Sequence, residues 1–192
     1  MGSSKTFAIE GRLVAAKNSN LDHPFWRYSL AVYSKDGVPQ ELIALQDTFD
    51  IDVNVALFCL WLGASAGLQL SEDQLTASLS RCRQWNIETV IPMRGVRRYL
   101  KSGTAVQPIA ERAAELRTHV KRLELLAEQI EQAILYDWFV GQRLPPSSGS
   151  PAKAEENLTL FMRRSTAGWD MQRTREVFAT TLNASAALEH TT

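Results

Sequence analysis

The sequence predicts an all-α fold, and three observations lead to this prediction. No segment shows the strict alternation of apolar and polar residues that marks a half-buried strand. Several stretches repeat apolar residues at intervals of three and four, which is the spacing of one helix face. Helix-capping residues precede several of these stretches. Together they predict a helical bundle with one long helix and a linked C-terminal helical pair.

The composition favours a soluble globular protein and excludes some partners. Of the 192 residues, 45% are hydrophobic and 22% are charged, and the 21 basic and 21 acidic side chains cancel. A neutral chain has no overall field to attract nucleic acid or an anionic membrane. Cys59 and Cys82 fit no metal-binding or redox spacing, so we expect reduced thiols and a cytoplasmic location. The longest apolar stretch, residues 55–66, is too short to cross a bilayer.

The first helices are predicted from their start signals. The run Asp22-His23-Pro24 places a cap before a proline and predicts a helix ending before Asp36-Gly37. Pro39 opens the second helix. Residues 53–66 are apolar nearly all round, as in a helix at the centre of a bundle. Residues 71–74 form a capping box that starts a helix running to about Trp85, and Pro92 is expected to interrupt the next one.

A long helix of about 30 residues follows, with a continuous apolar seam. The seam residues alternate spacings of four and three: Ile109, Ala113, Leu116, Val120, Leu123, Ala127, Ile130 and Ile134. Such a seam can pack within its own bundle or against a second copy, so residues 109–134 are the predicted surface for a protein partner or self-association. The expected organisation is a flexible arm (1–21), a bundle (22–140), a proline- and serine-rich linker (141–153) and a C-terminal helical extension (154–192).

Two catalogued patterns in residues 50–67 do not predict the chemistry usually associated with them. Asp50, Asp52 and Asn54 are spaced like the first ligands of a calcium loop, but Val55 and Trp61 occupy the positions of its glycine and glutamate. We therefore expect an aspartate that caps the following helix, and no metal site.

The pattern G-x-S-x-G at residues 63–67 requires a strand before the serine to form a nucleophile elbow. A buried helix precedes it here, so we interpret its small residues as a close helix contact and a helix end.

Two further groups of residues are candidate binding surfaces. The first is a basic face of four cations at helical spacing, which could dock phosphate or RNA: Arg94, Arg97, Arg98 and Lys101. The second is a group of polar and aromatic residues on the first and third helices, which could line a small-molecule pocket: Asp22, His23, Trp26, Arg27, Asp52, Asn54 and Trp61. Ion-paired helix faces and a packed aromatic core are the structural alternatives for the two groups. Neither group predicts a cofactor.

Two stretches, HPFWRYSLAVYSKDGV at residues 23–38 and ALQDTFDIDVNVALFCLWLG at residues 44–63, resemble an uncharacterised family of small proteobacterial proteins. The resemblance extends over residues 22–135 and includes Trp85 and Pro92. The family is a domain of unknown function, so the resemblance implies a bacterial cytoplasmic protein and no catalytic residue.

Three functions are compatible with these observations. Regular surfaces are plentiful and no known catalytic motif occurs, which favours a non-enzymatic helical interaction protein of the adaptor or scaffold type. The alternatives are a small-molecule-binding protein or small enzyme with a site between the first and third helices, and RNA or phosphate binding through the basic face.

Overall fold

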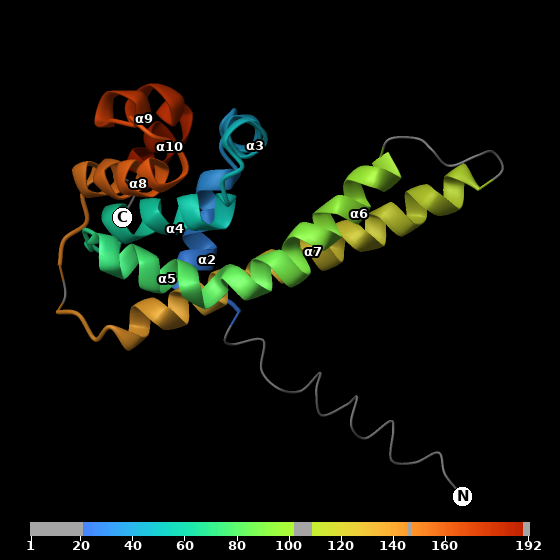
Figure 1. Cartoon of the computed structure of the whole chain (residues 1–192), viewed down its shortest axis with the longest axis horizontal. Helices are drawn as coiled ribbons and strands as arrows, with labels where there is room; N and C mark the ends of the chain where they lie inside the picture. The colour runs from blue at the N-terminus through green and yellow to red at the C-terminus, as the bar shows by residue number, and fades with distance from the viewer. Residues whose placement is uncertain (1–20, 102–108, 146, 190–192) are drawn as a thin grey trace, which may run out of the picture.

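The computed structural model describes residues 21–101, 109–145 and 147–189, and every regular element among them is helical (Figure 1). The all-α prediction is therefore confirmed. The predicted N-terminal arm, apart from Leu21, lies outside the described residues. In chain order the elements are α2 (Pro24–Tyr33), α3 (Val38–Phe49), α4 (Val53–Ala64), α5 (Glu72–Trp85), η2 (Asn86–Val90), α6 (Ile91–Lys101), α7 (Ala110–Gly141), α8 (Pro151–Ser165), α9 (Met171–Val177) and α10 (Ala179–Glu189).

Helix α4 lies at the centre of the molecule, as its all-apolar sequence predicts. Every residue from Asn54 to Ala64 is buried, and helices α2, α7, α8 and α10 pack around it. The Asp52 carboxylate caps the helix by accepting a hydrogen bond from the Asn54 backbone N–H at 2.9 Å. The capping interpretation of this acidic segment is thus confirmed for Asp52, whereas Asp50 ends the preceding helix α3.

Other predicted helix starts are also present. The cap of α2 is His23, whose Nδ1 accepts a hydrogen bond from the Trp26 backbone N–H at 3.1 Å. Ser71 and Gln74 form the predicted reciprocal capping box at the start of α5.

The chain does not break at Pro92, and this differs from the prediction. Helix α5 continues through the π-helical segment η2 into α6, so the helical path runs from Glu72 to Lys101 (Figure 1). A proline inside a helix lacks one N–H and its ring crowds the carbonyl four residues earlier. The wider turn of the π-helical segment ends at Val90, two residues before Pro92, and accommodates the proline without a break.

Helices α6 and α7 form a long antiparallel hairpin that projects from the body (Figure 1). The apolar seam therefore has two environments. Towards the C-terminal end of α7, Ala127 is buried and Ile134 packs against the core. Towards the projecting end, Ile109, Leu116 and Leu123 are about half exposed.

The C-terminal helices fold back onto the body and share its hydrophobic core. Helix α8 begins at Pro151, within the predicted linker, because Ser150 caps it and proline suits its first turn. The second helix of the predicted C-terminal pair is divided at Phe178 into two helices, α9 and α10. Because α10 begins a new helix, its first backbone N–H groups have no partner within the helix. The Glu41 carboxylate of α3 accepts hydrogen bonds from the backbone N–H groups of Thr180 and Thr181 at 2.9 and 2.8 Å. A distant side chain thus caps α10.

Candidate functional site

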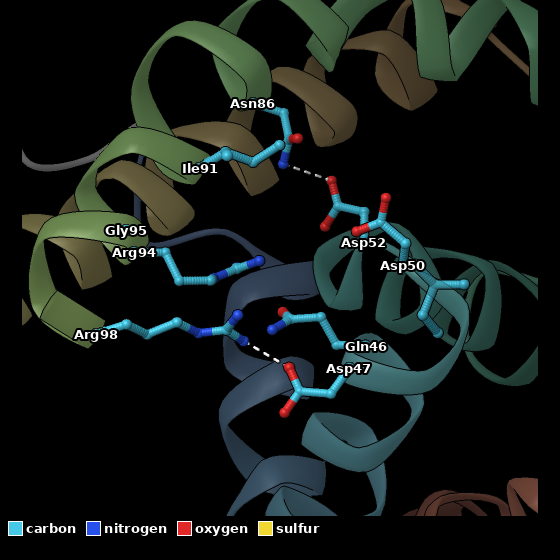
Figure 2. A pocket seen from close by; sticks show the side chains of 10 residues that line it. Gln46, Asp47, Asp50, Asp52, Asn86, Ile91, Arg94, Gly95 and Arg98 are labelled. Carbon is cyan, nitrogen blue, oxygen red and sulfur yellow. Dashed lines mark hydrogen bonds and ion pairs between the residues drawn. The ribbon is translucent and has the colours of Figure 1, made fainter. Parts of the chain in front are cut away.

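A polar pocket of about 330 Å³ lies between the junction of α3 and α4 on one side and η2 and α6 on the other (Figure 2). The body side carries carboxylates and the α6 side carries guanidinium groups. The pocket is lined by Gln46, Asp47, Asp50, Ile51, Asp52, Asn86, Ile91, Arg94, Gly95 and Arg98.

The acidic wall arises where two helices meet. Helix α3 ends at Asp50, which adopts a left-handed conformation with φ 51° and ψ 36°. Asparagine and aspartate tolerate this conformation better than other residues with a side chain. After Ile51, which is buried, Asp52 starts α4. This tight connection brings the two aspartates to the same side of the pocket (Figure 2).

One polar contact joins the two walls at each end of the pocket. At one end, Arg98 pairs with Asp47 at 2.5 Å, and both side chains are half exposed. At the other end, the Asn86 amide donates a hydrogen bond to Oδ2 of Asp52 at 2.8 Å. Figure 2 shows Arg94 and Gln46 between these two bridges.

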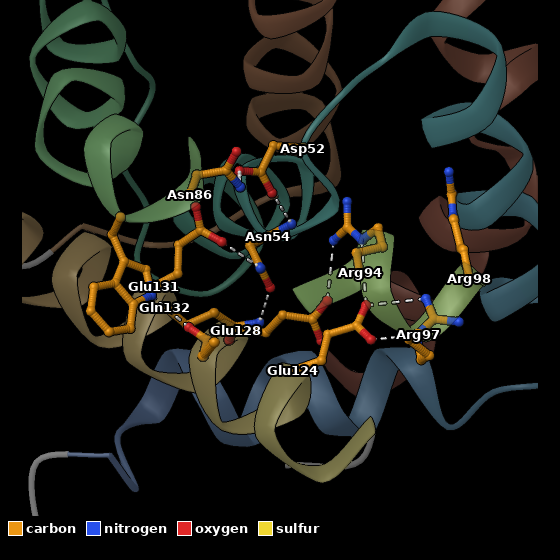
Figure 3. Close-up of polar contacts among 12 residues, drawn as sticks. Asp52, Asn54, Asn86, Arg94, Arg97, Arg98, Glu124, Glu128, Glu131 and Gln132 are labelled. Atoms are coloured by element: carbon orange, nitrogen blue, oxygen red, sulfur yellow. Dashed lines mark hydrogen bonds and ion pairs between the residues drawn. The ribbon is translucent and has the colours of Figure 1, made fainter. Parts of the chain in front are cut away.

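A buried hydrogen-bonded network lies behind Asp52 (Figure 3). The Asn54 amide donates to Oε2 of Glu131 at 2.8 Å and accepts from the Gln132 amide at 2.9 Å. Glu131 is fully buried on α7, so α4 and α7 are connected by polar groups inside the core. Buried polar groups of this kind fix one register between helices, because any other register leaves them unpaired.

Burial disfavours the ionised form of both carboxyl groups in this part of the protein, Glu131 and Asp52. Burial, together with the nearby negative charge of Asp52, raises the pKa of Glu131 to about 9. Burial also raises the pKa of Asp52, while a hydrogen bond from Glu131 acts in the opposite direction. At neutral pH Glu131 is therefore protonated.

The predicted basic face is largely compensated by acidic side chains. Arg94 lies 3.5 Å from Glu124 and 3.2 Å from Glu128, while Arg97 binds Glu124 through two nitrogens (Figure 3). Glu124 is almost completely buried, and its hydrogen bond raises the pKa of Arg97. With Arg98 paired to Asp47, three of the four predicted cations bind carboxylates of the same chain. The fourth cation, Lys101, is exposed at the end of α6.

The seven residues predicted to line a pocket between the first and third helices occupy separate environments. Asp22 and Arg27 form an exposed ion pair at 3.1 Å, and Trp26 is half-buried nearby. His23 is buried, stacks on Tyr136 with ring centroids 4.5 Å apart, and has a pKa lowered by burial.

The two remaining environments are the core and the polar network. Trp61 belongs to an aromatic cluster with Phe25, Phe58 and Phe139, and Asn54 belongs to the buried network. Of the seven residues, only Asp52 borders the pocket described above.

The pocket combines residues that no sequence pattern grouped together. Asp52 comes from the predicted pocket, Arg94 and Arg98 come from the predicted basic face, and Gln46 and Asn86 were in neither set. The available signal was charge: an aspartate-rich segment at residues 47–52 and a basic helix face at residues 94–101. Their proximity depends on how the hairpin leaves the body, which no local pattern reveals.

The G-x-S-x-G segment serves as a packing surface. A Cβ atom at Gly63 would lie 2.2 Å from the backbone nitrogen of Ala154, so α8 can approach α4 only because this residue is glycine. Gly67 has φ +71°, and a Cβ atom there would lie 2.1 Å from the Ser147 carbonyl oxygen. Ser65 itself is the residue at the C-terminal cap of α4.

The described ranges contain neither a reactive thiol nor a cluster of metal-binding side chains. Both thiols are buried, and burial raises the pKa of Cys59 and Cys82, so neither forms a nucleophilic thiolate at neutral pH. Within residues 21–101, 109–145 and 147–189, no group of three or more His, Cys, Asp or Glu side chains is placed to bind a metal ion. In the same ranges, no helix combines the length and apolar character that a membrane crossing requires.

Comparison with known proteins gives a family and no activity. No curated protein and no solved structure matches the chain. One family model, described as "Protein of unknown function (DUF2390)", matches residues 24–135, from the start of α2 to the buried Leu135 of α7. Because this match covers more than half of the sequence, the chain belongs to that family of proteins of unknown function.

Proposed function

We propose that this chain is a non-enzymatic helical interaction protein and that it binds an acidic, amphipathic helix of another protein along the α6–α7 hairpin. One observation carries the proposal. Ile109, at the N-terminal cap of α7, is followed at intervals of seven by Leu116 and Leu123, and the three residues are 57%, 51% and 52% exposed. Residues seven apart lie on one face of a helix, so this part of the seam forms an unpaired apolar stripe.

The hairpin also has an appropriate shape for a partner helix. Helices α6 and α7 project together from the body (Figure 1). Val96 on α6 is 48% exposed as well, so apolar surface is present on both helices. A partner helix that places apolar residues at intervals of three and four against the stripe would bury it.

The charge of the hairpin favours an acidic partner. Residues 91–125 contain eight basic and three acidic side chains, although the whole chain is neutral. The flanks of the apolar stripe include Arg112, which pairs with Glu115, and Arg122. Two hairpins of the same protein would bring like charges together, which costs free energy and disfavours self-association along this stripe.

Site-specific photo-crosslinking in the cells that naturally contain the protein tests this proposal. A photoreactive amino acid at Leu123 should yield a covalent adduct, and the same group at Thr118, exposed on the opposite side of α7, should not. Mass spectrometry then identifies the captured segment, and fluorescence anisotropy measures the affinity of that segment as a peptide.

The proposal requires an acidic, amphipathic helical peptide whose binding weakens with added salt and is lost in the Leu116→Asp, Leu123→Asp variant. Equal adduct formation at the two positions, or a captured segment without acidic and apolar character, contradicts it. Capture of a second copy of this chain would also contradict the proposal and would show that the stripe mediates self-association.

A second candidate function, the binding of a small molecule, is favoured by the polar pocket beside Asp52. The ion pairs of Arg94, Arg97 and Arg98 weigh against RNA or phosphate binding on the basic face, because a phosphate would have to displace carboxylates already in place.

A further inference from the structure

The pocket between the α3–α4 junction and α6 has polar groups that the protein's own contacts leave available. Nε of Arg94 faces Glu124 and Nη2 faces Glu128, so these contacts leave Nη1 for the pocket. Figure 2 shows the end of the Arg94 side chain directed into the space between Asp52 and Gln46. Because only 13% of this side chain is exposed, its position is fixed by its surroundings.

The opposite wall offers negative charge. The Asp50 carboxylate makes no hydrogen bond or ion pair with any described residue, and its residue is exposed at the pocket. Asp52 lies beside it and points to the same space (Figure 2). Asp52 is held in place by hydrogen bonds from the backbone N–H of Asn54 and from the amide of Asn86. One wall therefore presents carboxylates, and the other presents a guanidinium N–H.

The size of the pocket fits a small molecule. A volume of about 330 Å³ lies at the lower end of the range for ligand pockets. The Arg98–Asp47 pair and the Asn86–Asp52 hydrogen bond connect its two walls. The buried side chain of Ile51 and the half-exposed side chain of Ile91 supply limited apolar surface.

The mixture of charges selects the class of ligand. A simple anion at Arg94 would face the carboxylates of Asp47, Asp50 and Asp52, and a simple cation at those carboxylates would face Arg94 and Arg98. Either would gain from one wall and be repelled by the other. A molecule that carries both charges can satisfy the two walls at once.

We propose that this pocket binds a small zwitterion, a molecule with an ammonium group and a carboxylate a few bonds apart, such as an amino acid. The ammonium group donates hydrogen bonds to Asp50 and Asp52, and the carboxylate accepts hydrogen bonds from Arg94. The Gln46 amide, directed at the same space in Figure 2, contacts the polar part of the ligand. The binding site lies at the base of the hairpin and is independent of the apolar stripe.

The test is binding of defined small molecules to the full chain. The panel contains the protein amino acids and γ-aminobutyrate, each compared with its carboxamide and with its N-acetyl derivative. Isothermal titration calorimetry gives the affinity. Nuclear magnetic resonance of the side-chain amides of Gln46 and Asn86, both of which line the pocket, gives the location.

The expected result is at least one zwitterion that shifts these two amide signals at millimolar concentration. Its carboxamide and N-acetyl derivatives should bind at least about tenfold more weakly, because each lacks one of the two charges that the walls recognise. Asp50→Asn should weaken binding by a similar factor without unfolding the protein, because asparagine also tolerates the left-handed conformation. Asp36→Asn, at an exposed aspartate in the turn before α3, is the matched control and should bind as the unaltered protein does.

Three results would overturn the proposal. The first is that no member of the panel shifts the two amide signals. The second is a ligand that binds as tightly as its uncharged derivatives, which would mean that the charged walls are not what recognises it. The third is equal affinity in the Asp50→Asn and Asp36→Asn variants, which would place the ligand elsewhere.

Discussion

The side-chain amide of Asn54 donates a hydrogen bond to Oε2 of Glu131, 2.8 Å away in the protein interior. Asn54 lies in the first turn of the central helix α4, and Glu131 lies in the part of α7 that crosses the body. The contact therefore joins the base of the projecting hairpin to the centre of the fold. Through Asp52, the same network reaches the pocket.

Replacing Glu131 with glutamine should change how stability depends on pH. The unfolded chain releases the Glu131 proton near pH 4.5, whereas the folded protein holds it up to about pH 9. In this window the folded state binds more protons, so the free energy of unfolding falls as the pH rises, by at most about 1.4 kcal/mol per pH unit. Its contribution is fully present below pH 4.5 and is lost as the pH approaches 9.

Urea unfolding of both proteins at about pH 5, 7 and 9 measures this effect. The difference between the two proteins cancels titrating groups that do not interact with Glu131, including His23, whose lowered pKa contributes with the opposite sign. Glu72→Gln, at an exposed glutamate of α5, is the control and should keep the original pH dependence. If the free energy of unfolding changed with pH in the same way in the unaltered protein and in Glu131→Gln, Glu131 would be ionised at neutral pH.

Two glycine-to-alanine substitutions should have opposite effects. Gly63→Ala places a methyl group 2.2 Å from the Ala154 backbone nitrogen and forces α8 away from α4, so we expect a loss of at least about 1–3 kcal/mol. At Gly95 a Cβ atom meets nothing within 4 Å, and alanine favours the helix by about 0.8–1.0 kcal/mol. Thermal unfolding of the two variants should give melting temperatures on either side of that of the unaltered protein. Destabilisation by Gly95→Ala equal to that by Gly63→Ala would contradict this helix contact.

The Glu41 carboxylate should hold the start of α10 in place. Glu41→Ala removes the partners of the Thr180 and Thr181 backbone N–H groups, which should cost about 0.5–2 kcal/mol, as for the loss of a helix cap. Hydrogen exchange should accelerate at these amides, while exchange in α5 stays unchanged. Glu176→Ala, at an exposed glutamate of α9, provides the control. Unchanged protection of α10 in Glu41→Ala would mean that packing alone fixes this helix.

The ion pairs that Arg97 and Arg98 of α6 make should contribute differently to stability. Arg97 binds the nearly buried Glu124, and its loss should cost about 2 kcal/mol, because hydrogen bonds to charged groups contribute about 1.5–3 kcal/mol. The Arg98–Asp47 pair is half exposed on both sides and should contribute no more than about 1 kcal/mol. Urea unfolding of Arg97→Met and Arg98→Met measures both values. A larger loss in Arg98→Met would show that the hairpin is held mainly at the pocket.

Much of the fold could be predicted because its signals are local. A proline after His23, the reciprocal pair Ser71 and Gln74, and an aspartate before α4 each satisfy backbone groups within a few residues of themselves. Such interactions depend only on neighbours in the sequence, so they are visible without a structure. The break expected at Pro92 was wrong because a π-helical segment accommodates the proline.

The candidate site could not be predicted in the same way. Asp47, Asp50 and Asp52 lie close together in the sequence, but nothing near them indicates that Arg94 and Arg98 stand opposite. The predicted pocket grouped residues near the starts of two helices, including His23 and Asn54. In the structure His23 is a buried core residue and Asn54 belongs to a buried hydrogen-bonded network. Side chains at the ends of two helices converge only if the helices are packed that way, and packing depends on the whole chain.

The sequence by itself determined which segments are helical, where most of them begin, and that residues 53–64 occupy the centre, because capping and apolar periodicity act over a few residues. Only the tertiary structure decided that part of the apolar seam would stay exposed, that burial would raise the pKa of Glu131, and that an acidic junction would face a basic helix. These outcomes depend on contacts between residues far apart in the chain, and such contacts are set by how complete helices pack.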